Sequence, residues 1–124
     1  MEHNMFAWIE IPVNDMARAQ KFYETVFKID IQLVNFGGFE MGWFPFTKDA
    51  PGAAGTLVKQ ESYIPSTEGP LVYFYSKDVQ MELDRVESAG GKIYQKKTQI
   101  SEEHGYMGAF IDSEGNRVAL HSQK

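Results

Sequence analysis

The feature that most constrains the fold is a pattern of predicted elements that occurs twice along the chain. Asp15 and Asp78 each follow an apolar strand and can cap a helix with their carboxylates. Helices are predicted over 16–28 and 79–89, and Gly90-Gly91 is typical of a helix C-terminus. Three predicted strands follow each helix, so both halves have the order strand, helix, strand, strand, strand. This is an internal duplication of pattern, not of residue identity.

Apolar periodicity and turn residues place the strands of each half. The first half contains predicted strands at 8–13, 29–36, 39–46 and 55–60. The second half contains predicted strands at 71–78, 92–100, 105–112 and 117–122. The first helix carries an apolar stripe that we expect in the core, formed by Met16, Ala19, Phe22, Tyr23, Val26 and Phe27.

Composition limits the classes of function that are open to the chain. Its 124 residues are 43% hydrophobic and 14% aromatic, which suits one compact domain with a core. A net charge of −5 without a basic cluster makes nucleic acid a poor partner. The absence of cysteine excludes disulfides and thiolate chemistry. No apolar run can span a bilayer and the N-terminus is unlike a signal peptide, so we expect no membrane partner and a cytoplasmic location.

The first predicted strand, WIEIPVND, carries an unusual pair of residues. Ile9, Ile11 and Val13 alternate and can form one buried face. The other face then presents Glu10 beside Trp8. If that face meets water, the carboxylate needs no special role. If it lines a cavity, Glu10 is a candidate for ligand binding or catalysis.

Three segments resemble the vicinal oxygen chelate superfamily, which contains glyoxalase I, bleomycin-resistance proteins and extradiol dioxygenases. They are EIPVNDMARAQKFYETVF, VESAGGKI and FIDSEGNRVALHS, and the resemblance covers nearly the whole chain. It implies an α+β fold of two βαβββ modules in tandem, which form a concave mixed sheet around a cleft. Module one is expected at about 5–60 and module two at about 70–123. The cleft is expected to face the side chains opposite the helices.

The resemblance also implies where metal-dependent members hold their metal. Alignment from the two helix caps and the last turn places those positions at Trp8, Thr56, Leu71 and Ala119. A divalent metal needs His nitrogen or carboxylate oxygen, usually from three protein ligands or more. These four residues do not supply them, so we expect no metal cofactor. A metal held instead by Glu10 and His121 with Tyr73 is the disfavoured alternative.

Residues two positions further along the same strand faces give the candidate site. We expect Glu10, Tyr73 and His121 to converge in an apolar, aromatic pocket with Trp8. The ligand-binding set that we predict is Trp8, Glu10, Trp43, Thr56, Tyr73 and His121. Phe44 is the alternative to Trp43 in the wall of the pocket.

Glu10 and His121 leave three roles open. They can act as general acid and base, orient a polar ligand by hydrogen bonds, or bond only to each other. The preferred hypothesis is a binding protein of the bleomycin-resistance type, which holds a small organic molecule without the family's catalytic metal. The alternative is a glyoxalase-like lyase or isomerase that uses Glu10 and His121 as acid and base or as displaced metal ligands. A non-catalytic partner module is the third hypothesis. The resemblance also implies a homodimer, with the pocket either within one chain or between two.

Overall fold

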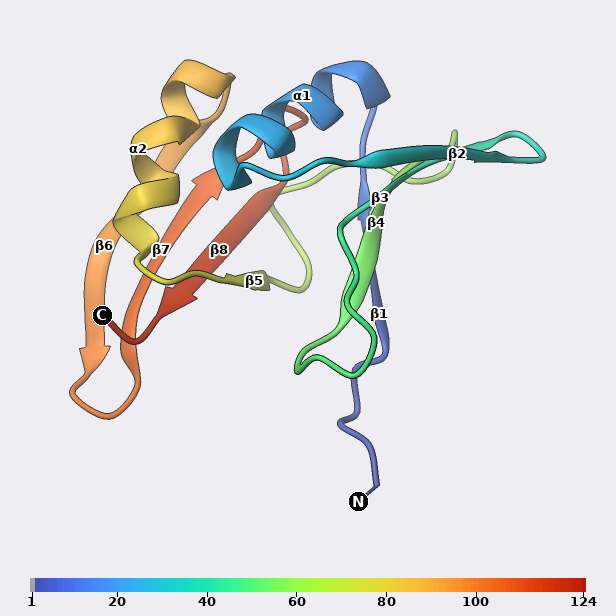
Figure 1. Ribbon diagram of the computed structural model, residues 1–124. Helices are drawn as coiled ribbons and strands as arrows, with labels where there is room; N and C mark the ends of the chain where they lie inside the picture. The colour runs from blue at the N-terminus through green and yellow to red at the C-terminus, as the bar shows by residue number, and fades with distance from the viewer. Residues whose placement is uncertain (1) are drawn as a thin grey trace.

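Each half of the chain folds into one helix and one four-stranded sheet (Figure 1). The computed structural model describes residues 2–124, except for the side chain of Phe36. The first module contains β1 (Trp8–Pro12), α1 (Met16–Phe27), β2 (Gln32–Phe36), β3 (Phe39–Trp43) and β4 (Ala54–Lys59). The second module contains β5 (Val72–Tyr75), α2 (Val79–Ala89), β6 (Lys92–Ser101), β7 (Gly105–Ile111) and β8 (Arg117–Ser122). The duplicated order predicted from the sequence is therefore confirmed.

The two sheets share one topology, so the α+β class and the tandem arrangement are confirmed. The strand orders are β1-β4-β3-β2 and β5-β8-β7-β6. The pairs β1–β4 and β5–β8 are parallel, whereas all other pairs are antiparallel. As a result β1 and β5 are both edge strands of their sheets.

Three strands are shorter than predicted by three residues or more, each for a different reason. β2 begins at Gln32 and not at 29, since the Glu24 carboxylate accepts the Ile31 backbone N–H at 2.8 Å. β3 ends at Trp43, shortly before Pro45, which has no N–H to donate to a ladder. β5 ends at Tyr75, after which the chain turns into the cap of α2.

Both helices begin at the predicted caps. The Asp15 carboxylate accepts the Arg18 backbone N–H at 3.0 Å, and the Asp78 carboxylate accepts that of Gln80 at 3.0 Å. Gly90 ends α2 at a φ of 107°, a left-handed conformation that favours glycine. The apolar stripe of α1 lies in the core as expected, with Phe27 partly buried. Among residues 2–124, no helix is both long and apolar enough to cross a membrane.

An aromatic cluster joins the modules on the helix side of the sheets. Phe74 of β5 packs against Phe27, with ring centroids 4.6 Å apart, and against Phe44 at 5.5 Å. Tyr23 contacts Phe44 and Phe74 at 5.5 and 6.0 Å. The helices pack against each other on this side (Figure 1). Each sheet therefore keeps an open face that is turned away from the helices.

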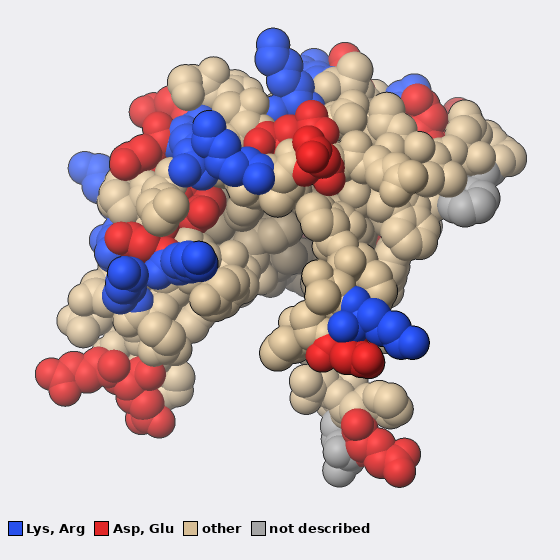
Figure 2. Space-filling model, in the orientation of Figure 1, with Lys and Arg blue, Asp and Glu red and all other residues tan. Residues whose placement is uncertain are grey.

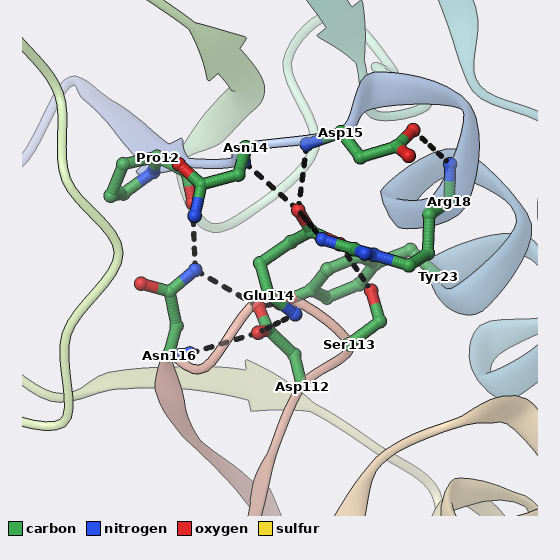
Figure 3. Close-up of polar contacts among 9 residues, drawn as sticks. All are labelled: Pro12, Asn14, Asp15, Arg18, Tyr23, Asp112, Ser113, Glu114 and Asn116. Carbon is green, nitrogen blue, oxygen red and sulfur yellow. Dashed lines mark hydrogen bonds and ion pairs between the residues drawn. The ribbon is translucent and has the colours of Figure 1, made fainter. Parts of the chain in front are cut away.

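The turn between β7 and β8 ties the second module to the start of α1 (Figure 3). The buried Glu114 carboxylate accepts the backbone N–H groups of Asn14 and Asp15 at 2.9 and 2.8 Å. It also accepts hydrogen bonds from Nε and Nη2 of Arg18 at 2.7 and 3.0 Å. Burial alone would raise the pKa of Glu114, but the hydrogen bonds from Arg18, Asp15, Ser113 and Asn14 outweigh it and lower that pKa.

Asp112 and Asn116 complete this junction from the same turn. The Tyr23 hydroxyl donates to Asp112 Oδ2 at 2.6 Å, and the side-chain amide of Asn116 donates to the Pro12 carbonyl at 2.7 Å. Burial and then the Asp112 charge raise the pKa of Tyr23 well above its ordinary value. The hydroxyl therefore remains a hydrogen-bond donor. These bonds fix the end of β1, and with it the direction in which the side chains of β1 point.

Candidate functional site

The main cleft lies between the two edge strands, β1 and β5. It has a volume of about 700 Å³. Residues of β1, the connector between the modules, β5 and the start of β8 line it. They include Phe6, Trp8, Glu10, Ile64, Glu68, Leu71, Tyr73 and Arg117. Figure 2 shows charged side chains on the outer parts of two lobes and a hollow between them with mostly uncharged walls.

Strand alternation decides which β1 and β5 side chains lie on the open faces of the two sheets. Ile9 and Ile11 pack toward the core on the helix side, which leaves Trp8 and Glu10 on the open face. Tyr73 of β5 also lies on the open face of its sheet and is 51% exposed. The structure thus brings together three of the predicted site residues, Trp8, Glu10 and Tyr73, along one cleft.

Trp43 and Thr56 lie next to this cleft on the open face of the first sheet. Thr56 is paired with Glu10 on one side and with Trp43 on the other. The Trp43 ring meets the Trp8 ring edge to face, with centroids 5.1 Å apart. Thr56 is fully buried, and neither its Oγ1 nor Trp43 Nε1 has a hydrogen-bond partner among the described residues. Phe44, the alternative to Trp43, points instead into the aromatic core.

The strand registers test which residues occupy equivalent positions in the two modules. Glu10 pairs with Thr56 in the first sheet, and Tyr73 pairs with Ala119 in the second. Glu10 and Tyr73 lie equally far before their helix caps, and Thr56 and Ala119 lie equally far after them. The alignment of Thr56 with Ala119 therefore agrees with the strand pairing. Of the four positions at which relatives are expected to bind metal, only Thr56 offers an oxygen donor, and Trp8, Leu71 and Ala119 offer none. These residues do not fit a divalent metal.

His121, like Trp43 and Thr56, is not among the residues that line the main cleft. It lies on the open face of β8, where it pairs with Tyr75 and Met107. Its Nε2–H donates to the carbonyl oxygen of His104 at 2.6 Å. No hydrogen bond between His121 and Glu10 is found in the described part of the chain, nor any group of three His, Asp or Glu residues placed to hold a metal.

A smaller cleft of about 400 Å³ continues on the other side of the same strands. It shares Ile9, Ile11, Val72 and Tyr73 with the main cleft. Its remaining walls come from the helix-to-strand segment at Phe27 and Ile29 and from the loop that contains Pro51. The seam between the modules is therefore hollow on both sides of β1 and β5.

Arg117 is the cleft residue that sequence reasoning missed. It is the first residue of β8 and directly follows the turn that holds Glu114. The alternation of β8 was the one sequence signal that could have placed Arg117 on the open face, because it precedes Ala119 by two residues on the same strand. The connector before β5, read only as a loop, also supplies cleft walls at Ile64, Glu68 and Pro70.

Comparison with known proteins identifies the family. The family model described as the Glyoxalase/Bleomycin resistance protein/Dioxygenase superfamily matches residues 5–120, so the chain belongs to this superfamily. No curated protein matches it in a sequence search.

Solved structures give the same fold at low sequence identity. Glyoxalase I from Zea mays is 17% identical with a TM-score of 0.70, and the match covers 94% of this chain and 45% of that one. A glyoxalase/bleomycin resistance protein from Albidiferax ferrireducens T118 is 16% identical with a TM-score of 0.68, covering 98% of this chain and 100% of that one. A hypothetical protein from S. aureus is 15% identical with a TM-score of 0.71, covering 97% and 95%. The chain thus spans less than half of the maize enzyme, and these likenesses concern the fold.

Proposed function

We propose that this protein binds a small organic molecule in the cleft between its modules and does so without a divalent metal. The observation that carries this proposal is the set of residues at the family's metal positions. An indole, a buried hydroxyl, an isobutyl group and a methyl group stand there, at Trp8, Thr56, Leu71 and Ala119. Such residues favour contact with an apolar ligand over coordination of a cation.

The size and walls of the cleft support the same proposal. Ligand pockets commonly have volumes of about 300–1,000 Å³ and apolar linings with a few polar groups that orient the ligand. This cleft has about 700 Å³ and places Glu10 and Tyr73 among apolar and aromatic side chains. Trp8, which is 40% exposed, offers a ring face to the ligand.

Acid–base catalysis by Glu10 and His121 is the less supported alternative. Both groups would have to reach one ligand within hydrogen-bond distance. Glu10 lines the main cleft, but His121 is bonded to the His104 carbonyl on another strand. We therefore give Glu10 a role in orienting the ligand, and a lyase or isomerase activity is not our preferred conclusion.

We also propose a homodimer. Tyr73 and Tyr75 share one face of β5 and are 51% and 78% exposed, respectively, and Phe6, which lines the main cleft together with Tyr73, is 82% exposed. Large apolar side chains grouped on one surface are typical of a surface that pairs with another chain. Sedimentation velocity tests this, and a single monomeric species at micromolar concentration would contradict it. The cytoplasmic location stays a prediction.

The binding proposal is tested by a fragment screen followed with amide chemical shifts. We expect hits to shift the backbone amides of 8–11 and 71–73, with or without EDTA. Leu71→Trp fills the cleft and is expected to weaken these hits at least about tenfold, or about 1.4 kcal/mol. Leu33→Trp is the matched control, because Leu33 is 52% exposed and lies outside the main cleft.

Two results would contradict the proposal. The first is a set of hits that shift amides outside β1 and β5 and that bind the Leu71→Trp variant as tightly as the unmodified protein. The second is binding that EDTA abolishes and that added metal restores.

A further inference from the structure

Arg117 brings a cation to the wall of the main cleft. Val118 and Leu120 of β8 are buried in the core, so the alternation of the strand puts Arg117 on the open face with Ala119. Its position is fixed by the backbone, because its N–H donates to the Ser66 carbonyl at 3.3 Å. Arg117 lines the cleft that Trp8 and Glu10 also line.

The guanidinium has unused hydrogen-bonding capacity. Its Nε is buried and has no partner among the described residues. One Nη2 contact, to the Gly69 carbonyl, is at 3.5 Å, the outer limit of a hydrogen bond. An arginine carries five N–H donors, and the one bond from Nη2 is weak, so the Nη groups can still donate to a ligand in the cleft.

No described carboxylate neutralises this cation. Glu10 and Glu68 also line the cleft, yet no ion pair within 4.0 Å joins either of them to Arg117 in the described part of the chain. Their negative charges stand in the same cleft as the guanidinium. A ligand with one negative charge can meet Arg117, whereas a second negative charge is opposed by Glu10 and Glu68.

Two hydrogen bonds at Ser66 attach the connector to the start of β8 without the Arg117 guanidinium. The Ser66 backbone N–H donates to Asn116 Oδ1 at 3.0 Å, and the Arg117 backbone N–H returns to the Ser66 carbonyl. These two bonds fasten the connector to the start of β8. Apart from the weak bond of Nη2 to the Gly69 carbonyl, the Nη groups of Arg117 are left for another partner.

We propose that the cleft selects small monocarboxylic acids with an aromatic or aliphatic body, and that Arg117 binds the carboxylate. The two terminal Nη groups form a planar fork that matches two carboxylate oxygens. The apolar body then lies against Trp8 and Tyr73, which suits the mostly apolar walls. This inference rests on the proposed binding function and names its ligand class.

The test compares each acid with its neutral isostere. Calorimetry and amide shifts are recorded for 3-phenylpropionate against 3-phenylpropionamide and for octanoate against octanamide. In the unmodified protein we expect each acid to bind at least about tenfold more tightly than its amide, as a charged hydrogen bond allows. Phenylsuccinate, with a second carboxylate, is expected to bind more weakly than 3-phenylpropionate.

Three variants assign this preference to the guanidinium. Arg117→Gln is expected to remove the acid preference and to leave the affinity for the amides unchanged. Arg117→Lys keeps the charge but loses the fork, so it should retain part of the preference and also provides a folded test if the Gln variant fails to fold. Lys96→Gln changes the net charge equally at an exposed residue of β6 and should behave as the unmodified protein.

The outcomes separate the two proposals. Equal affinity for acid and amide, or an acid preference that survives Arg117→Gln, overturns the monocarboxylate inference. If amides or neutral fragments shift the backbone amides of 8–11 and 71–73 but the acids do not, the monocarboxylate inference fails and the binding function stands. If neither acids, amides nor neutral fragments bind, both proposals fail.

Discussion

The rings of Trp8 and Trp43 meet edge to face on the open face of the first sheet, with centroids 5.1 Å apart and an angle of 66° between their planes. Trp8 stands at a position where metal-dependent relatives are expected to carry a ligand. Trp43 lies beside the buried Thr56, a second such position. The aromatic contact of Trp8 and Trp43 therefore covers that face beside Thr56.

Thr56→Val tests whether this face is an apolar packing surface. Thr56 is 0% exposed, and its Oγ1 lacks a partner in the described structure. Replacing an unbonded buried hydroxyl with a methyl of similar shape should raise the free energy of unfolding by about 1 kcal/mol. Urea denaturation measures the change, with the exposed Thr47→Val as control. A loss of stability would show that the hydroxyl has a partner, and would count against the packing account.

Tyr23→Phe tests the junction between the modules. The change removes the hydroxyl that donates to Asp112 at 2.6 Å and leaves the buried ring in place. Because the acceptor is a carboxylate, we expect the free energy of unfolding to fall by about 1.5–3 kcal/mol. Tyr94→Phe, on a ring that is 59% exposed, is the control and should change little. Equal values for the two variants in urea denaturation would contradict a structural role for this bond.

Glu114 should make stability depend on pH in the acid range. Its pKa is lowered in the folded protein, so its contribution is complete above its unfolded-state pKa of about 4.3 and is lost as pH falls through the lower folded value. Glu114→Gln should lower the free energy of unfolding by about 1.5–3 kcal/mol at neutral pH. The difference from the unmodified protein should then shrink as pH falls below about 4.3.

Denaturation at several pH values checks this prediction. Glu102→Gln, at an exposed glutamate in the turn between β6 and β7, is the matched control. A difference between the unmodified protein and Glu114→Gln that does not vary with pH would disprove the role given to the carboxylate charge.

The helix caps and the order of helices and strands along the chain could be predicted, because they depend on neighbouring residues. Asp15 and Asp78 bond to backbone groups two or three residues away, and the alternation of β1 distinguishes Ile9 and Ile11 from Trp8 and Glu10. The ends of β2 and β3 were less predictable. A side chain of α1 captures the Ile31 N–H, which is a tertiary contact.

The junction and cleft contacts that sequence reasoning missed join distant segments of the chain. Glu114 reaches Asn14 and Arg18 across about 100 residues of chain, and no local pattern reports such a bond. The same holds for Arg117, which meets the connector at Ser66 and Gly69. His121 was placed on the correct face of β8, but strand alternation does not predict its bond to the His104 carbonyl.

A calorimetric titration of the untagged protein with Zn²⁺, Ni²⁺, Mn²⁺ and Fe²⁺ tests the central claim most directly. The account predicts no stoichiometric binding of any of these ions, because the four metal positions carry only one oxygen donor and no nitrogen donor. One-to-one binding that Glu10→Gln or His121→Ala abolishes would contradict it. That result would reveal a displaced metal site and would favour a glyoxalase-like enzyme over a metal-free binding protein.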